Sequence, residues 1–478
     1  MSSSSSSTFI PYNKRAQAIN EDTIVAHSGH INTMNLIRDH NGAIVCDLGS
    51  SMVKAGLAGE SFPKAVFPTI IGKPKPQIDT RKLFGARDKM NQNQSHFVGL
   101  EAHHRKGICE LSHPIQRGGK TVQNWDEIEL LLEHIYHFHL RVNPKEHPIL
   151  LTEQPFTSVT HRQKYIELLF EKFQSHSLFF TIQGLLSIYA SGDLDGIVLD
   201  SGDGSTHVVP VFDGYPQTYA MAKSELAGCD ITHHLTQLML QHSGYDFTHN
   251  SASLDFVRDV KESSCYVALN YDHTMKLYEQ SKQTRSQGHD TSSGSINGNG
   301  NSRNGSISGN GSSINGNSRN NSSSHSTRHD QKDTLDSFNA QFQLPDGSLI
   351  NIDRERFQSC EILFQPNMIG SEELGIHQLL NQSIHQCNMD IRKFMYKNII
   401  LSGGNTLVKG IQERLTREMS RMVGGAVRLR IVAPPERKYS VWMGGSIISS
   451  LSSFQDRWIK RADYEEFGCD LLSKMLFH

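Results

Sequence analysis

The chain has 478 residues, of which 37% are hydrophobic, so it is long enough for two large domains with a core each. Its 47 Lys and Arg residues nearly balance 49 Asp and Glu residues, which argues against binding to nucleic acid through bulk charge. No apolar run approaches the roughly 20 residues that cross a bilayer, and no secretory apolar segment opens the chain. We therefore expect a soluble intracellular protein with no membrane insertion. The cysteines lack zinc-ligand spacing and are expected to be reduced and mostly buried.

The predicted elements begin after a polar arm, residues 1–42, which opens with consecutive serines and is predicted to be disordered. Residues 77–95 are polar and are predicted to form an exposed loop. An amphipathic helix is predicted from Asn124 through Arg141, because apolar residues as far as Phe138 recur at helical spacing.

Strands and helices then alternate along the chain. Buried strands are predicted over 148–153 and 179–182, and helices over 161–173 and 183–191. Because a strand-turn-strand unit of one plan heads each half, this alternation predicts two related α/β domains that face each other across a cleft. Residues 281–330 consist mainly of Ser, Asn and Gly, and they are predicted to form a disordered, flexible insert.

The strand-turn-strand unit at residues 197–207 has the composition of a phosphate site. Its turn contains Gly202 and Gly204, which let backbone N–H groups converge on an anion. Asp200 and Asp203 would repel that anion unless a cation such as Mg²⁺ lay between them. Taken alone, an Asp-Gly turn between strands is more often an ordinary hairpin.

A second unit with this plan spans residues 43–54. It places Asp47 and Gly49 at the turn and adds Lys54 as a point charge, so the two hairpins could clamp one polyphosphate from opposite sides. A third glycine site, at 398–406, has paired glycines between a buried strand and a predicted helix. It could be a simple tight turn, but its plan matches the other two units and favours close approach of a ligand to the backbone.

Several motifs resemble the actin and actin-related protein family, from about Ala43 to the C-terminal end, and only insertions interrupt the resemblance. The motifs are Asp200 to Gly204 with Thr206 and His207, Val257 to Glu262 with Cys265 to Leu269, Asp390 to Lys393, Leu401 to Gly404, and Ala433 to Trp442. They are long, ordered and highly specific.

The resemblance implies an α/β protein with the actin fold. This fold has two ribonuclease H-like domains, divided into four subdomains, around a cleft for ATP or ADP with Mg²⁺. The first lobe would comprise residues 43–190 and 440–478, with 69–113 as subdomain 2. Residues 191–439 would form the second lobe, subdomains 3 and 4.

By the same resemblance, Asp47 and Asp200 would hold the hydrated Mg²⁺. Gln183 and His207 would position the attacking water, a step that needs orientation and charge stabilisation more than a strong base. Without the resemblance, Gln183 could merely cap its helix and His207 could be a satisfied core histidine. The other expected contacts are Gly49, Ser50, Ser51, Met52, Lys54, Asp200, Gly202, Asp203, Gly204 and Ser205 at the phosphates, and Gly228, Arg258, Lys261, Glu262, Gly403, Gly404 and Lys438 around the ribose and adenine.

The chain also departs from conventional actin. Leu48 and Ser51 replace an Asn and a Gly in the first phosphate loop, so nucleotide affinity or turnover is expected to be altered. Val408 stands where a Tyr normally lies against adenine, and Arg117 where actin carries its modified His. The loop over 77–97 is longer than in actin.

Two functions remain open. The first is an ATP-binding actin-related protein of the cytoplasm and cytoskeleton that joins, caps or regulates actin-like filaments, with slow ATP hydrolysis. Its partners would be actin or actin-related protomers and actin-binding proteins. The second is an ATP-bound structural subunit of a nuclear chromatin-remodelling complex, partnered by the other remodelling subunits. No direct nucleic-acid binding is expected, and retention of Gln183, His207 and both Mg²⁺ aspartates favours the first function.

A hydrophobic cleft that many actin partners use is largely matched. Leu194 lies in it where actin has a Thr. The matching residues are Tyr189, Gly192, Gly444, Ile448, Leu451 and Phe454.

Overall fold

The computed structural model describes residues 42–76, 96–115, 122, 124–248, 251–288, 338–344, 347–424 and 427–471. The predicted N-terminal arm up to residue 41 and the predicted loop over 77–95 lie outside these residues, as does Arg117. Of the predicted insert, residues 281–288 belong to a helix, and the remainder lies outside the described residues.

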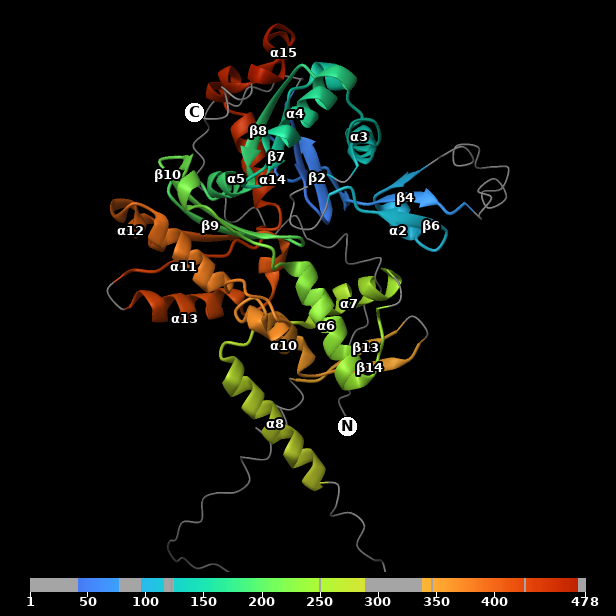
Figure 1. Cartoon of the computed structure of the whole chain (residues 1–478), viewed down its shortest axis with the longest axis vertical. Coiled ribbons are helices and arrows are strands. Elements are labelled where there is room, and N and C mark those ends of the chain that lie inside the picture. The colour runs from blue at the N-terminus through green and yellow to red at the C-terminus, as the bar shows by residue number, and fades with distance from the viewer. Residues whose placement is uncertain are drawn as a thin grey trace, which may run out of the picture.

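The first sheet has six strands in the order β17-β8-β7-β1-β2-β3 and forms the upper part of Figure 1. β1 and β2 form an antiparallel hairpin, and β7 runs parallel to β1 on its other side. All residues of β1 are buried, as is usual for a strand covered on both faces of its sheet. The strands are β1 (Ile44–Leu48), β2 (Met52–Leu57), β3 (Ala65–Pro68), β7 (Ile149–Glu153), β8 (Ser177–Ile182) and β17 (Ile459–Lys460).

The second sheet repeats this plan. Its main path has the order β11-β10-β9-β15-β16, with β12 paired to β10. β9 and β10 form an antiparallel hairpin, and β15 runs parallel to β9 as β7 does to β1. The strands are β9 (Gly196–Ser201), β10 (Thr206–Phe212), β11 (Tyr215–Pro216), β12 (Ala222–Ser224), β15 (Ile399–Ser402) and β16 (Ile431–Val432). The two related α/β units predicted from the sequence are therefore present.

Two helices lie between the sheets, α5 (Gln183–Ala190) and α14 (Ser440–Ser449). They approach so closely that a Cβ on Gly444 would collide with the carbonyl oxygen of Leu186. On its other side α5 packs on the second sheet, where a Cβ on Gly184 would lie only 2.7 Å from Val209. These glycines allow α5 to contact both halves of the molecule.

The remaining helices pack on the sheets or on one another, except that α8 extends away from the second lobe, and two small sheets extend from the main body (Figure 1). On the first lobe they are α2 (Leu100–His104), α3 (Trp125–Glu133), α4 (Val159–Glu167) and α15 (Arg461–Phe467), with short 3₁₀ segments at Pro144–Glu146, Ser452–Arg457 and Gly468–Leu471. On the second lobe they are α6 (Gly228–Ser243), α7 (Ser251–Ser264), α8 (Tyr271–Gly288), α10 (Glu355–Glu361), α11 (Ile376–Gln386), α12 (Met389–Lys397) and α13 (Ile411–Val423), with 3₁₀ segments at Thr218–Ala220, Pro366–Ile369 and Gly404–Leu407. The small sheets are β5 (Phe97–Val98), β4 (Ile71–Pro74) and β6 (Cys109–Ser112) in one, and β13 (Ala340–Gln343) and β14 (Leu349–Ile352) in the other.

Two predicted helices contain π turns that the sequence pattern did not reveal. α3 ends at Glu133 and continues as a π-helix, His134–Leu140, while α4 continues as another, Leu168–Lys172. Because a π turn adds a residue, it rotates the side chains that follow. Phe138, expected on the apolar face of a regular helix, is 65% exposed for this reason.

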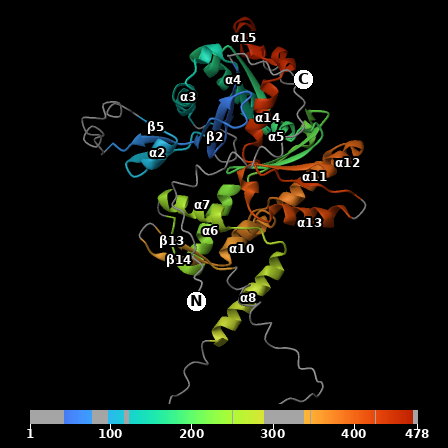
Figure 2. The same ribbon diagram turned by 180° about the vertical axis from the view of Figure 1, so that it is seen from behind.

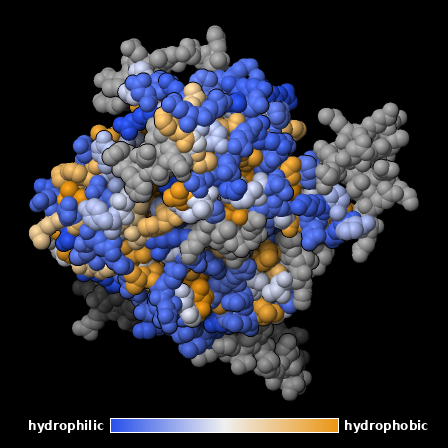
Figure 3. All heavy atoms as spheres, turned by 45° about the horizontal axis from the view of Figure 1, so that its top comes forward, coloured by the Kyte–Doolittle hydropathy of each residue, from blue (hydrophilic) through white to orange (hydrophobic). Residues whose placement is uncertain are grey.

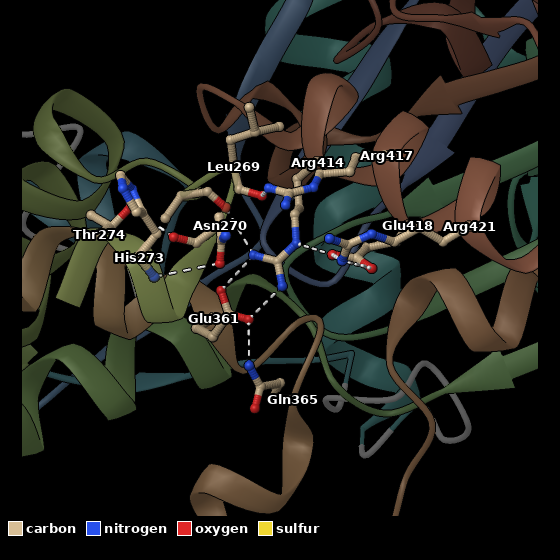
Figure 4. A network of polar contacts seen from close by, with 11 residues as sticks. Leu269, Asn270, His273, Thr274, Glu361, Gln365, Arg414, Arg417, Glu418 and Arg421 are labelled. Carbon is tan, nitrogen blue, oxygen red and sulfur yellow. Dashed lines mark hydrogen bonds and ion pairs between the residues drawn. The ribbon is translucent and has the colours of Figure 1, made fainter. Parts of the chain in front are cut away.

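A buried ion pair joins α13 to α10 in the second lobe (Figure 4). Arg414 donates from Nη1 and Nη2 to the two carboxylate oxygens of Glu361 at 2.9 and 2.8 Å, and from Nε to Glu418 at 2.8 Å. It also donates to the Ala268 carbonyl, at the entry to α8. This arrangement fixes three segments that are distant in the sequence.

The views from the two sides agree that α8 extends away from the second lobe (Figures 1 and 2). The face shown in Figure 3 is mainly hydrophilic with separate hydrophobic patches. Among the described helices, none combines the length and apolar character needed to cross a membrane. Cys469 is partly exposed, and the other cysteines are buried.

Candidate functional site

Asp47 lies at the end of β1, where four elements converge. Its Oδ2 accepts a hydrogen bond from Lys54 Nζ at 2.8 Å, while Oδ1 accepts from Thr152 Oγ1 at 2.6 Å and Gln183 Nε2 at 2.9 Å. Burial acts to raise the pKa of Asp47, but the charge of Lys54 and these three hydrogen bonds hold that pKa below its usual value. Asp47 is therefore an ionised carboxylate at neutral pH.

The turn after Asp47 is held by hydrogen bonds from the chain that follows β3. Thr69 donates from Oγ1 to the Gly49 carbonyl at 2.7 Å and from its N–H to the Ser51 carbonyl at 2.9 Å. A Cβ on Gly49 would lie 2.7 Å from the Met52 carbonyl oxygen, so glycine is needed at this turn. Ser50, Ser51 and Met52 are half-buried and remain available at its surface.

Asp200 has the same place in the second sheet that Asp47 has in the first. Burial and the charge of Asp47 raise the pKa of Asp200 to about 6, despite the opposing effect of Lys54. Burial acts to lower the pKa of Lys54, but Asp47 and then Asp200 raise it above its ordinary value. Lys54 is thus the cation between two buried carboxyl groups.

His207 pairs across β9 and β10 with Asp200. Burial lowers the pKa of His207 to about 3, so the imidazole is neutral near pH 7. Its buried Nε2 has no hydrogen-bond partner in the described part of the chain. This nitrogen can donate to or accept from a bound group.

The second glycine turn rests on the first residues of α6. The Gly228 N–H donates to the Gly202 carbonyl at 3.1 Å, and Lys261 Nζ donates to the Gly228 carbonyl at 2.7 Å. Within the turn, the Gly202 N–H donates to the Ser205 carbonyl at 3.0 Å. Gly204 and Ser205 are buried and Asp203 is half-buried. The turn therefore lies at a helix N-terminus, where the helix dipole favours an anion.

The third glycine site follows β15 and meets the second turn. Gly403 has φ +87°, and a Cβ there would collide with the Ser201 carbonyl and lie 2.7 Å from Asp200 Oδ1. A Cβ on Gly404 would meet nothing within 4 Å. Asn405 Nδ2 donates to Ser201 Oγ at 2.9 Å, while its buried Oδ1 has no partner in the described part of the chain. All three predicted glycine sites are thus brought together.

The remaining predicted residues lie at the periphery. Arg258, on α7, pairs with Asp255 at 3.5 Å, and its buried Nε has no partner among the described residues. Glu262 is exposed and Lys438 is half-buried. Where the chain is described, neither forms an ion pair with the other candidate residues.

A link between the lobes closes one side of the site. Lys106, just after α2, donates to Asp255 of α7 at 2.7 Å, and His103 Nε2 lies 3.8 Å from the same carboxylate. Figures 1 and 2 both show the small β4 sheet with α2 facing α7 across this side of the molecule. The sequence motifs did not indicate this contact.

The described part of the chain has two notable cavities, and only the smaller one borders the site. One of about 50 Å³ lies behind Gln183 and is also lined by Thr152, Glu153 and Arg162. Arg162 binds Glu153 through two hydrogen bonds of 2.6 Å, which fixes the wall of this cavity. The other, of about 260 Å³, lies beside the polar network of Figure 4. We place the candidate site where the charged groups and glycine turns converge, because neither cavity is lined by the glycine turns.

Sequence reasoning missed Thr152 and Asn405. Thr152 stands in an apolar strand without a motif, and its only signal is a hydroxyl near the carboxyl end of a strand parallel to β1. Strands that run parallel end at the same edge of a sheet, so this position could have been placed near Asp47. Asn405 directly follows the paired glycines and could have been included with them.

A family model described as Actin matches residues 38–477 of the chain. The match covers nearly the whole sequence, and the chain belongs to the actin family. The predicted α/β fold class is confirmed, with several sheets and many helices arranged as the actin fold requires. The chain is an actin-like ATP-binding protein, of a family whose fold generally binds ATP or ADP with a divalent cation.

Proposed function

We propose that this chain binds ATP or ADP with Mg²⁺ between its two glycine hairpins and hydrolyses ATP slowly. The observation that carries this proposal is the convergence of Lys54 and Gln183 on Asp47, with Asp200 close enough to affect the pKa of Lys54. Glycine turns from both sheets flank these groups. They supply the backbone donors, cation and carboxylates that a Mg²⁺-bound polyphosphate requires.

The residues of the site fit a nucleotide with bound Mg²⁺. Two buried carboxyl groups share one lysine, and the proximity of Asp47 raises the pKa of Asp200, an interaction that a divalent cation would relieve. Among the described residues, no cluster of three His, Cys, Asp or Glu side chains could hold a metal ion. Two carboxylates with the remaining positions filled by water and phosphate are typical of Mg²⁺ rather than of zinc.

In this proposal the phosphates lie against the first and second glycine turns, with Lys54 as their point charge. The first turn contributes Gly49, Ser50, Ser51 and Met52, and the second contributes Gly202, Asp203, Gly204 and Ser205. Asp47 and Asp200 would hold the hydrated Mg²⁺, which would supply charge neutralisation at the phosphates. The ribose and adenine would lie among Gly228, Arg258, Lys261, Glu262, Gly403, Gly404 and Lys438.

Hydrolysis in this site depends on positioning. Gln183 and His207 orient the attacking water, and the neutral imidazole suits that role because its Nε2 has no partner among the residues that the structure describes. A γ-phosphoryl transfer needs an in-line water and charge stabilisation more than a strong base.

The test is to release and quantify the nucleotide that purifies with the chain, and to follow phosphate release after adding Mg²⁺·ATP. We expect about one ATP or ADP per chain, and we expect Asp47→Asn to remove it because a buried negative charge at the cation position is lost. Asp456→Asn, an exposed carboxylate remote from the site, is the matched control. Absence of nucleotide, together with no thermal stabilisation by added Mg²⁺·ATP, would contradict the proposal.

We further propose that the protein acts in the cytoplasm and cytoskeleton by joining, capping or regulating actin-like filaments. Support comes from the predicted partner cleft, where Tyr189 and Leu451 pack on the buried side chains of Ile448 and Phe454 while Leu194 is 56% exposed. Adding the purified chain to elongating actin is expected to change the elongation rate. No effect on actin, with chromatin-remodelling subunits co-purifying instead, would favour the nuclear alternative.

A further inference from the structure

Thr152 makes the shortest of the three hydrogen bonds to Asp47, 2.6 Å from Oγ1 to Oδ1. It stands on β7, which lies between β1 and β8 in the first sheet, and only 7% of it is exposed. A β-branched side chain on a buried strand has few accessible rotamers, so the hydroxyl is fixed by the sheet itself. Thr152 therefore determines where the Asp47 carboxylate points.

The hydrogen bonds on Asp47 leave little capacity for another donor. A carboxylate offers about four lone-pair positions. Lys54, Thr152 and Gln183 already occupy three of them. If the waters of a hydrated cation need more than one position on Asp47, one of the three side chains must leave.

Gln183 is the donor best able to leave. Its amide is neutral and reaches Asp47 from the first residue of α5, on a side chain with three rotatable bonds. Lys54 is retained by charge attraction to Asp47 and Asp200, and Thr152 is held by its strand. Of the three hydrogen bonds to Asp47, the one from Gln183 is therefore the least costly to break.

We propose that Thr152 is a positioning residue that holds the Asp47 carboxylate while Gln183 is released from Asp47 on binding of the cation and nucleotide. This inference rests on the proposed nucleotide site. It makes Gln183 available for orienting water only in the loaded protein, because in the present arrangement its amide is engaged by Asp47. Thr152 keeps the Asp47 carboxylate in position while the hydrogen bond from Gln183 is replaced.

The first experiment tests Thr152 with a fluorescent ATP analogue, etheno-ATP, and a titration of Mg²⁺ that measures retention of the analogue. A hydrogen bond to a charged group is worth enough that Thr152→Val should raise the half-saturating Mg²⁺ concentration about tenfold. Thr152→Ser keeps the hydroxyl group, so its half-saturating Mg²⁺ concentration should stay close to that of the wild type. Thr181→Val is the matched control, because Thr181 is the buried register partner of Thr152 on β8 and is not among the three donors to Asp47, which are Lys54, Thr152 and Gln183.

The second experiment tests whether Gln183 leaves Asp47, by measuring whether a Gln183 variant raises or lowers the half-saturating Mg²⁺ concentration. Gln183→Met removes a competitor for Asp47 Oδ1, so the half-saturating Mg²⁺ concentration should fall, opposite to Thr152→Val. ATP hydrolysis by the same variant should fall as well. A role for Gln183 in packing alone would not separate cation affinity from turnover in this way.

The outcomes distinguish this inference from the proposed function. If the wild-type chain retains no etheno-ATP at any Mg²⁺ concentration, the proposed site itself is wrong. If it retains the analogue but Thr152→Val titrates like Thr181→Val, Thr152 has no positioning role. An increase in half-saturating Mg²⁺ for Gln183→Met, as large as that for Thr152→Val, would overturn the exchange. Melting temperatures of all variants without nucleotide show whether each remains folded.

Discussion

At the residue scale, two aspartates occupy equivalent places in their sheets but have pKa values shifted in opposite directions. Asp47 has Lys54 as a direct partner at 2.8 Å, and its pKa is held below the usual value. Burial, and then the charge of Asp47, raise the pKa of Asp200 to about 6, although Lys54 and a hydrogen bond from Ser402 oppose the rise. The pair is thus strained by like charge at neutral pH, and a bound cation would remove that strain.

This difference predicts how stability without nucleotide depends on pH. The pKa of Asp200 is about 6 in the folded chain against an ordinary value of 3.8, so the folded state binds the extra proton between these values. Stability from this group is therefore present at low pH and lost as pH rises from about 4 to about 6. Asp200→Asn avoids this loss of stability. At pH 7.5 the free energy of unfolding of the nucleotide-free variant should therefore exceed that of the wild type by on the order of 3 kcal/mol.

Chemical denaturation in EDTA and apyrase at pH 7.5 measures this difference, with the two proteins compared again near pH 4, where it should vanish. The same variant should gain little stability from Mg²⁺·ATP, because it lacks one cation-holding carboxylate. Equal stability of variant and wild type at pH 7.5 would mean that Asp200 is not strained in the nucleotide-free protein.

At the scale of elements, the second lobe depends on the ion pair that joins α13 to α10 (Figure 4). The side chain of Glu361 is 0% exposed and that of Arg414 only 7%. Burial acts to raise the pKa of Glu361, so its charge is tolerated only because Arg414 binds both of its oxygens. A change to either partner alone leaves a buried charge or a buried polar group unpaired.

We therefore expect Arg414→Met to destabilise the chain by about 3–5 kcal/mol. The double variant Arg414→Met with Glu361→Gln should recover part of that loss, because no unpaired charge remains. Arg461→Met is the matched control, since its pair with Glu465 is exposed and worth less than about 1 kcal/mol. Urea unfolding measures all three. Similar stability of Arg414→Met and Arg461→Met would show that the buried pair does not hold the lobe.

The sequence allowed the two hairpins to be predicted because each carries its chemistry in a short segment, Asp, Gly and hydroxyl residues between apolar strands. Gly403 could be placed with them for the same reason. The π turn that exposes Phe138 could not be predicted, because the apolar residues as far as Phe138 recur at the spacing of a regular α-helix and give no sign of the extra residue in the turn. Thr152 and the Lys106–Asp255 contact depend on which strands and lobes become neighbours, and local sequence does not contain that information.

At the scale of the whole molecule, the lobes meet at two places of different physical character within the described part of the chain. α5 and α14 form a tightly packed, apolar connection in which glycines permit direct backbone contact. The opposite connection, Lys106 with Asp255, is a partly exposed ion pair with side-chain exposures of 28% and 22%. Opening at the second place costs far less than disruption of the first, because a partly exposed ion pair is weak.

This asymmetry predicts a salt-dependent barrier to nucleotide release. Lys106→Ala should speed the release of etheno-ATP by on the order of twofold to fivefold at low salt, the range that corresponds to up to about 1 kcal/mol. The difference from the wild type should shrink at 0.5 M salt, where exposed pairs are screened. Lys164→Ala, which breaks an exposed pair with Glu167 away from the site, is the control. A release rate unaffected by Lys106→Ala at low salt would show that this contact does not restrain the lobes.

The final prediction concerns self-assembly. Filaments of the actin type use heterologous, non-closing contacts, so each protomer must present both faces of one interface. The segment from Phe364 to Ile376 resembles the family's hydrophobic plug, and here Glu373 holds it to the chain's own second lobe by accepting from Ser224 Oγ and from the Glu225 N–H at 3.1 Å. By its resemblance to actin, the longer loop over 77–97 would be the part that docks into the next subunit, and most of it lies outside the described residues.

On this resemblance, the plug segment keeps the sequence of one face of the interface and is held to the chain's own second lobe. The loop over 77–97, which would form the other face, differs in sequence. We expect the purified chain to remain monomeric or form short oligomers under conditions in which actin polymerises, while still joining or capping an actin end. Sedimentation and electron microscopy test the first part, and filament elongation the second. Glu373→Ala should release the plug segment without affecting nucleotide retention, and any gain in assembly by this variant would identify the pinning as a restraint. Long filaments of the unmodified chain alone would contradict the prediction, since they require both faces to be competent.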